Sequence, residues 1–333
     1  MISDNVTELK NIISGINDSD LISRILVLGR YGSRLFGTAT EESDYDYIAV
    51  YMPKQDDVLL LNNEHVFKKV FVNNNHTYDI VFISLPSYFE SLNTYNNMQM
   101  LEMLFVDDKD ILIKNKFYNE IRNNRNLFLS KDLNLFSKFA RIQASKYSFK
   151  GAKYNFLTEF VTFLKGIDDS DYTVGDLNKV ITNQYPNKIE LLIEITDKSI
   201  FIFEKEFFKT IKLKYFISRL ESMLDKYSER SITAANDGGV DRKALYHAVR
   251  VASETIELIQ TKTLVFPLPY AKYLNTIRSG ELSVEDIMRD IEIKLEQIDK
   301  LILTSHDLPD KIDRSKTFNL YKTIMKVYME NII

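Results

Sequence analysis

Apolar residues change their spacing along the chain at Pro86. After an amphipathic start that predicts a helix over residues 5–19, they stand in short runs or at alternate positions, which is typical of strands. Beyond Pro86 they recur every three or four residues, which is typical of helices. The pattern predicts strands over residues 24–28, 44–52, 64–72 and 77–85, and helices over residues 87–105, 133–164, 200–224, 242–261 and 284–303.

Turn-forming residues divide these elements into two parts. Asn73 to His76 predicts a hairpin between the last two strands, because asparagine tolerates positive φ. Residues 236–239 predict a linker, and residues 266–269, with two prolines, predict a helix stop. We therefore expect an α/β module over residues 1–125, followed by a mainly helical domain over residues 126–333. The amphipathic tail, residues 317–333, is expected to dock on the helical domain or on a second subunit.

Composition narrows the class of protein. The chain has 333 residues, a formal net charge of −4 and no cysteine, so disulfides and thiolate metal sites are excluded. The first residues lack the pattern of a signal peptide, and no apolar run is long enough to span a membrane. We expect a cytoplasmic protein, or one of the host cytoplasm if a phage encodes it, as the asparagine-, lysine- and isoleucine-rich sequence would suit. The mild acidity argues against a general nucleic-acid coat protein and leaves room for a local basic groove.

Two aspartates at alternate positions interrupt the aromatic strand over residues 44–52. Successive side chains of a strand point to opposite faces, so Asp44 and Asp46 are predicted to share one face. Such a pair can hold one or two hard cations. Asp79, near the start of a neighbouring strand, is the best candidate for a third carboxylate. The three residues predict a two-metal site.

Gly32 and Ser33 follow the first buried strand and open a short helical turn. Free backbone N–H groups and a hydroxyl at such a turn suit the phosphates of a nucleotide. Together with the carboxylates, the turn favours phosphoryl or nucleotidyl transfer.

Three other interpretations compete for the same stretch. Gly32 to Gly37 has Walker A spacing, but Thr38 and Ala39 stand where lysine and a hydroxyl residue are required. A calcium loop needs more oxygen-bearing side chains than residues 43–47 supply. The plainest interpretation, a helix cap at Ser33 followed by a solvated edge strand, stays open.

The glycine-serine turn followed by D-x-D resembles the signature of the DNA polymerase β-like nucleotidyltransferases. The closer resemblance is to the YcgL/RlaP group of predicted nucleotidyltransferases from bacteria and large phages, which gene neighbourhood associates with RNA repair. YDIVFISLPSYFESL and MLEMLF resemble that group's strand and following helix. DRKALYHAVRVASETIELIQTKTLVFPL and IRSGELSVEDI resemble its C-terminal signature. The likeness covers most of residues 24–300, loosely over residues 155–235.

The resemblance implies an α+β fold, with a polymerase β-like nucleotidyltransferase module on a mixed sheet followed by a mainly helical C-terminal domain. It implies transfer of a nucleoside monophosphate from an NTP, ATP among the candidates, with Mg²⁺ or Mn²⁺ held by Asp44, Asp46 and Asp79. Gly32, Ser33 and Arg34 would contact the nucleotide. Residues 93–97 hold no lysine where the group has one, so no phosphate contact is expected there.

Two basic groups lie on the predicted helices. Lys146 and Lys150 could meet the triphosphate or an RNA backbone, or could belong to a solvated face; they form a stripe with Lys138, Arg141 and Lys153. Lys243, His247 and Arg250 share a helix face and are candidates for the acceptor site, with an exposed polar face as the alternative. Glu102 lies in an apolar helix and is expected to hold an arginine or a backbone amide. The other histidines, His65, His76 and His306, have no metal-ligand spacing.

We therefore expect an enzyme that transfers a nucleotide to a hydroxyl, most plausibly the end of an RNA such as tRNA. The alternatives are nucleotidylation of a protein or a small molecule, and a catalytically silent nucleotide-binding protein. Nucleotide preference, template use and oligomeric state stay open.

Overall fold

The computed structural model describes residues 20–59, 66–73, 76–146, 150–167, 172–186, 192–203, 205–226 and 241–330, without the side chains of residues 55, 59, 73 and 143–152. The predicted helix over residues 5–19 and the predicted linker over residues 236–239 lie outside this range. The chain folds into two compact units, Met1–Arg141 with Tyr246–Ile333, and Ile142–Leu245. A functional boundary after residue 125 stays a prediction, since compactness alone does not separate catalytic from binding roles.

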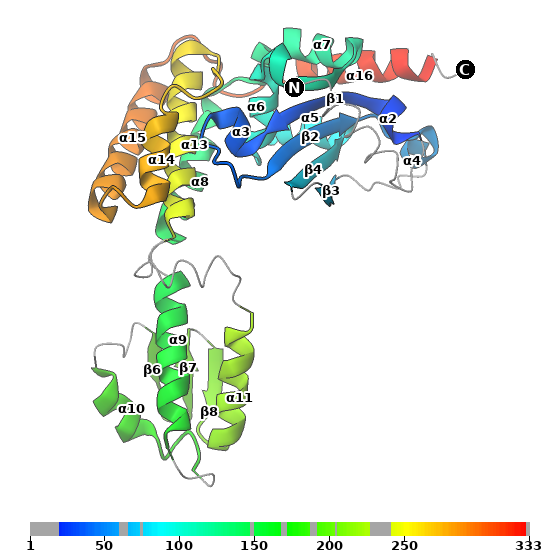
Figure 1. Ribbon diagram of the computed structural model, residues 1–333. Coiled ribbons are helices and arrows are strands. Elements are labelled where there is room, and N and C mark those ends of the chain that lie inside the picture. Colours follow the sequence, from blue (N-terminus) through cyan, green and yellow to red (C-terminus); the bar gives the residue numbers. More distant parts are fainter. Residues whose placement is uncertain are drawn as a thin grey trace. The chain divides into compact units, whose positions relative to one another are not determined.

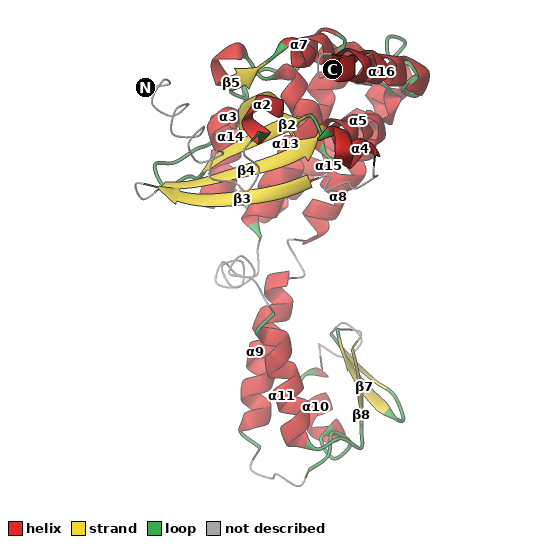
Figure 2. Ribbon diagram, turned by 90° about the vertical axis from the view of Figure 1, so that its right-hand side faces the viewer, coloured by secondary structure: helices red, strands yellow, loops and turns green. Residues whose placement is uncertain are grey.

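A five-stranded sheet with the order β3-β4-β2-β1-β5 forms the centre of the first unit (Figures 1 and 2). β2 and β4 run parallel and the other neighbours antiparallel, so the sheet is mixed, and the predicted α+β class is confirmed. The short edge strand β5 was not predicted. The strands are β1 (Ile25–Tyr31), β2 (Tyr45–Tyr51), β3 (Val66–Asn73), β4 (His76–Ser84) and β5 (Ile111–Lys114).

The two faces of the sheet have different roles. Tyr47, Ala49 and Tyr51 of β2 point into a buried cluster with Tyr78, Ile80 and Phe82 of β4. Because side chains alternate, Asp46 and Asp79 point to the opposite face. The aromatic residues between the aspartates therefore serve the core, while the aspartates themselves are left for a site.

The predicted helix over residues 87–105 is wrong as a single element. It divides into α5 (Leu85–Thr94), α6 (Met98–Glu102) and the 3₁₀ turn η1 (Met103–Phe105). Tyr95 ends α5 in the left-handed region with φ 50°. Asn97 then caps α6 by accepting a hydrogen bond from the N–H of Gln99 at 3.0 Å. The asparagines here act as local hydrogen-bonding groups and break the helix.

The C-terminal helices complete the first unit. The predictions over residues 242–261 and 284–303 are confirmed by α13 (Arg242–Thr261) and α15 (Val284–Thr304). The tail forms α16 (Arg314–Glu330) and packs on α5 through Phe89 and Tyr321, with ring centroids 5.3 Å apart. It therefore docks on the α/β module, which the apolar pattern alone could not indicate. The remaining helices of this unit include α2 (Leu21–Arg24), α3 (Gly32–Phe36), α4 (Gln55–Leu59), α7 (Lys116–Asn123), α8 (Leu135–Lys146) and α14 (Ala271–Ser279).

The second unit has a core of its own. α9 (Lys150–Lys165) and α11 (Leu213–Leu224) cover one face of a three-stranded sheet, β6 (Ile193–Ile195), β7 (Ser199–Ile202) and β8 (Lys205–Phe208), with α10 (Asn178–Gln184) beside them (Figure 2). The predicted helix over residues 200–224 is therefore wrong before Leu213. Residues 199–202 pair with both neighbouring strands, and residues 205–208 pair with them in turn, with Ile200, Ile202 and Phe207 buried in the core. The prediction over residues 133–164 is confirmed as two helices, α8 and α9, while residues 147–149 lie outside the described range.

Across the described ranges, no helix has both the length and the apolar composition needed to cross a membrane.

Candidate active site

Asp46 and Asp79 lie next to each other on the same face of the sheet. They stand directly opposite each other in the register of the parallel strands β2 and β4. Neighbouring strands are about 4.8 Å apart, so one cation could contact both carboxylates. Oδ1 of Asp79 is buried without a hydrogen-bond partner, and Oδ2 forms an ion pair with Lys68 of β3. Of the three carboxylates predicted to form the metal site, the sheet brings Asp46 and Asp79 together.

Asp44 occupies a different environment from Asp46. β2 begins at Tyr45, so the predicted strand alternation does not include Asp44, whose side chain is exposed in the connection before the strand. Arg34 fixes this connection: Nη2 donates to the carbonyl of Ser43 at 2.6 Å and Nε donates to that of Asp44 at 3.2 Å. The Arg34 guanidinium also lies 3.8 Å from the centroid of the Tyr45 ring. Arg34 thus holds the entry to the D-x-D strand, and its predicted nucleotide contact stays a prediction.

Gly32 brings the glycine-serine turn against Asp46. Its φ is +68°, and a Cβ at this position would overlap Oδ2 of Asp46. Only glycine allows both this backbone conformation and this approach. Ser33, half-buried, is the second residue of α3. The predicted phosphate turn and the predicted carboxylate pair are therefore adjacent in space.

Distant parts of the chain fix the other end of the turn. The Thr38 and Tyr246 hydroxyls are 3.0 Å apart, and the N–H of Leu268 donates to the carbonyl of Phe36 at 3.1 Å. Nη1 of Arg278 donates to the carbonyl of Thr38 at 3.3 Å. Figure 1 shows α3 beside α13 and α14, from which Tyr246 and Arg278 come. Thr38 and Tyr246 were missed by sequence reasoning, because neither residue carries a recognisable spacing.

Arg250 is the centre of a buried charge cluster behind the turn. Its Nη1 donates to Oε1 of Glu102 at 2.5 Å and to Oε2 of Glu254 at 2.8 Å, and its guanidinium lies 4.4 Å from the centroid of the Phe36 ring. The Arg250 side chain is only 5% exposed. The expectation that Glu102 holds an arginine is confirmed. The burial of Arg250 contradicts its expected place in the acceptor site; its contacts with two acidic partners and the Phe36 ring explain the burial.

The cluster contains more negative than positive groups. Burial raises the pKa of Glu254 well above its ordinary value, and the Glu102 carboxylate adds to the rise while Arg250 opposes it. With one proton bound between the two carboxylates, the buried cluster of Arg250, Glu102 and Glu254 would carry one positive and one negative charge. Glu254 was missed at the sequence level, although its spacing four residues after Arg250 is that of a helical ion pair.

The other predicted binding residues are distributed differently. Lys243 is exposed and His247 half-buried on α13, so they share a helix but not one uniform surface with Arg250. Lys146 and Lys150 belong to α8 and α9, and their side chains lie outside the described set. In the same stripe, Arg141 is exposed and forms an ion pair with Asp299 at 3.4 Å. The acceptor and nucleotide roles of these residues stay predictions.

The residues present fit a divalent cation in part. Among the residues that the structure describes, no group of three or more His, Cys, Asp or Glu side chains is arranged to hold a metal ion. Asp46 and Asp79, with the unpartnered oxygen of Asp79 and the glycine at position 32, nevertheless supply hard oxygen ligands in a cradle that a Cβ would fill. Asp46 and Asp79 are therefore the residues that would hold a cation, with Asp44 as an exposed third candidate.

Comparison with known proteins gives a family match for the part of the chain that contains this site. Residues 2–159 match the family model "RlaP: RNA repair pathway DNA polymerase beta family". A curated relative is 25% identical over 92% of this chain and 98% of its own length; it is described as an uncharacterised 38.9 kDa protein in the nrdC-mobD intergenic region of Enterobacteria phage T4. The part of the chain that contains the candidate site is thus similar to a polymerase β family, and the relative that matches nearly the whole chain comes from a phage.

Among solved structures, the chain is similar to the crystal structure of a nucleotidyltransferase-like protein from Exiguobacterium sibiricum. The two are 8% identical, and the likeness covers 91% of this chain and 75% of the other, with a TM-score of 0.29. A TM-score this low carries no argument about shared geometry.

Substituting Gly32→Ala is expected to destabilise the protein by about 1 to 3 kcal/mol, because the new Cβ meets Asp46 and the residue keeps a positive φ. Urea unfolding measures this cost. In an Asp46→Ala background the cost should be smaller, since the contact with Oδ2 is gone. An equal cost in both backgrounds would show that the approach of the turn to Asp46 is not what requires glycine.

Either single variant, Glu102→Gln or Glu254→Gln, is expected to keep the stability of the protein near neutral pH, because Arg250 retains one carboxylate. The double variant leaves Arg250 buried without a charged partner and should lose about 3 to 5 kcal/mol. Thermal and urea unfolding would measure these differences.

The same variants test the shared proton. Because the folded-state pKa of Glu254 is raised above 4.5, its contribution to stability is full at pH values below 4.5 and is lost as the pH rises through the folded-state value. Glu254→Gln should therefore flatten the pH dependence of unfolding above this point. If each single variant were as unstable as the double, the cluster would have to contain two ionised carboxylates.

Proposed function

We propose that the protein transfers a nucleoside monophosphate from an NTP to a hydroxyl group at the end of an RNA, in RNA repair. The adjacency of Asp46, Asp79 and the Gly32 turn is the observation that carries this proposal. The family match supports nucleotidyl transfer and the link to RNA repair, since the family is named as the DNA polymerase beta family of an RNA repair pathway.

Asp46 and Asp79 would hold Mg²⁺ or Mn²⁺, with Asp44 joining from the connection before β2. Bound there, such ions lower the pKa of an attacking hydroxyl and neutralise the leaving pyrophosphate. The protein's own contribution is positioning. Gly32 allows the turn to approach the carboxylates, and the backbone N–H groups near Ser33 and Arg34 would orient the phosphates of the NTP.

The buried cluster of Arg250, Glu102 and Glu254 and the neighbouring helices support this position of α3. α3 is only five residues long and could not hold its own orientation. It is packed between β2 and the helices α13 and α14, and Arg250 lies over the Phe36 ring at its end. We assign Arg250, Glu102 and Glu254 to the positioning of the turn and leave substrate contacts to the residues in front of it.

Incubating the protein with each α-labelled NTP, Mg²⁺ or Mn²⁺, and total tRNA tests the proposal. We expect label in RNA with the intact protein and a loss of at least about a thousandfold in Asp46→Asn and in Asp79→Asn, because each removes a charge that the cation needs. Lys69→Met is the matched control, because the exposed Lys69 lies on the face of β3 that points away from Asp79.

The destination of the label decides between acceptors. Label found on a protein or a small molecule, and not on RNA, would show that the acceptor is one of these alternatives. Binding of NTP without transfer to any acceptor, under conditions where the variants also bind, would indicate a catalytically silent binding protein.

Lys68 is expected to compete with a cation for Asp79, because its ammonium group pairs with the same carboxylate. An exposed ion pair contributes about 0.2 to 1 kcal/mol, which a cation that displaces Lys68 from Asp79 has to offset. Lys68→Met removes this cost and should therefore bind Mn²⁺ up to about fivefold more tightly. Electron paramagnetic resonance of free Mn²⁺ measures the affinity without any substrate.

Lys69→Met is again the control, since Lys69 lies in register with Ile80 on the core side of β4 and carries the same charge. Equal affinities of the two variants would show that only net charge matters. Mn²⁺ binding that is unaffected by Asp46→Asn would place the cation elsewhere.

A further inference from the structure

The second unit exposes aromatic side chains among lysines. Phe208, at the end of β8, is 57% exposed, and Tyr215, in the first turn of α11, is also 57% exposed. Tyr172, which precedes α10, is 41% exposed. We call residues 172–175 and 205–215 the aromatic-lysine ribbon; its lysines are Lys205, Lys209, Lys212 and Lys214.

Backbone hydrogen bonds hold the two segments of the ribbon side by side. The N–H of Gly175 donates to the carbonyl of Lys209 at 2.9 Å, and the N–H of Leu213 donates to that of Tyr172 at 2.8 Å. A further bond joins the N–H of Ile211 to the carbonyl of Phe208 at 3.2 Å. Segments far apart in the sequence therefore lie at one end of this unit, and the three exposed aromatic residues belong to one continuous backbone structure.

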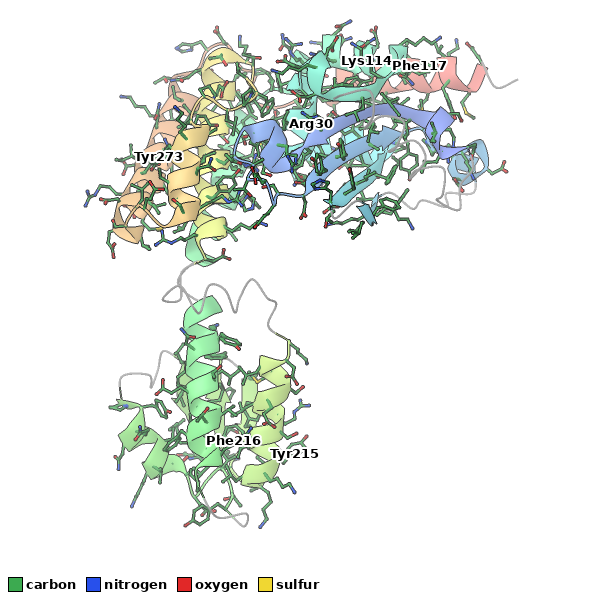
Figure 3. All side chains as sticks on the ribbon, in the orientation of Figure 1. Arg30, Lys114, Phe117, Tyr215, Phe216 and Tyr273 are labelled. Carbon is green, nitrogen blue, oxygen red and sulfur yellow. The ribbon has the colours of Figure 1, made fainter. Side chains whose placement is uncertain are left out.

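Phe208 and Tyr215 do not take part in the core of the second unit. Their neighbours Phe207 and Phe216 are buried and pack edge to face with ring centroids 4.8 Å apart. Figure 3 shows Phe216 between α9 and α11, whereas Tyr215 projects from the outer side of α11. Singly exposed apolar side chains are normal on a protein surface, whereas several exposed rings on one continuous backbone structure indicate a candidate interaction surface.

Asp176, which directly follows the first segment of the ribbon, and Glu206, within the second, accept hydrogen bonds from hydroxyl groups. Asp176 accepts hydrogen bonds from the hydroxyl and the N–H of Thr173, which lower its pKa, as Lys212 also does, and Glu206 accepts one from the hydroxyl of Ser199 at 2.7 Å. Lys205, Lys212 and Lys214 are exposed, and Lys209 is half-buried. The ribbon thus offers both rings and positive charge to solvent.

We propose that the aromatic-lysine ribbon binds single-stranded RNA, with bases stacked on Phe208, Tyr215 and Tyr172 and phosphates facing the lysines. Single-stranded nucleic acid is the partner that uses both features at once, since every base has a face for stacking and every linkage a negative charge. A folded acidic protein could pair with the lysines, but it would not present a regular series of flat groups that stack on the aromatic side chains. The inference deepens the proposed function and rests on it, because the bound strand would be the acceptor.

Binding of a short fluorescein-labelled single-stranded RNA to the full chain, without NTP or divalent metal, tests the proposal by fluorescence anisotropy over a range of salt concentrations. Phe208→Ala/Tyr215→Ala should weaken binding by about tenfold or more and leave the salt dependence unchanged. Lys209→Glu/Lys212→Glu/Lys214→Glu should weaken binding and reduce the slope of log K against log salt by about 2, at about 0.7 per contact.

Matched controls lie outside the ribbon. Lys226→Glu follows the far end of α11, and Phe318→Ala removes an exposed phenylalanine from α16 of the first unit; both should bind RNA like the unaltered protein. The chain contains no tryptophan, so Tyr215→Trp adds a single fluorophore that RNA should quench if stacking occurs. Circular dichroism confirms that each variant is folded.

The proposal is overturned if the aromatic double variant binds RNA like the unaltered protein, if Tyr215→Trp fluorescence does not respond, or if polyphosphate competes as well as RNA per phosphate. Its failure is separable from that of the proposed function. Asp46→Asn should bind RNA normally, so RNA binding without any transfer would contradict only the catalytic proposal. Transfer to RNA with an unchanged KM in Phe208→Ala/Tyr215→Ala would contradict only the ribbon.

Discussion

The buried contact between Arg250, Glu102 and Glu254 links the parts of the chain on which the site depends. Glu102 comes from α6, between β4 and β5. Arg250 and Glu254 come from α13, far later in the sequence, and the Phe36 ring comes from α3, between β1 and β2. A buried ion cluster is weak evidence for stability by itself, because desolvation offsets much of the attraction. The enclosed guanidinium has its charged partners only where these elements meet, so α6, α13 and α3 must lie together for its charge to be satisfied.

This constraint explains why the ends of the chain form one unit. α13 must return to the turn at Gly32 for Tyr246 to meet Thr38 and for Arg250 to meet Glu102. Residues between α8 and α13 are then free to form a unit with its own core, Phe160, Ile200 and Phe216 among its buried residues. A module built in this way can carry an additional unit without changing the register of Asp46 and Asp79.

Local patterns anticipated the parts of the structure that depend on near neighbours. The alternation in β2 and β4 and the glycine-serine turn depend on strand period and on the conformational freedom of glycine, which act within a few residues. The helical spacing of α13 and α15 is equally local. The predictions failed where tertiary context decides between similar patterns. Asparagine hydrogen bonds divide the helix predicted over residues 87–105, and residues 199–202 and 205–208 form strands whose buried side chains, among them Ile200 and Phe207, complete the core under α9 and α11.

The sequence by itself determined the class of fold, the positions of Asp46 and Asp79 on strands and the glycine-serine turn that opens α3. Only the tertiary structure decided which strand lies next to which, and with it that Asp79 is the partner of Asp46 and that Lys68 neutralises Asp79. It also decided that Arg250 is buried while Phe208 and Tyr215 are exposed. The physical reason is that periodicity specifies which side of an element a residue faces, whereas burial and pairing depend on what the rest of the chain packs against that side.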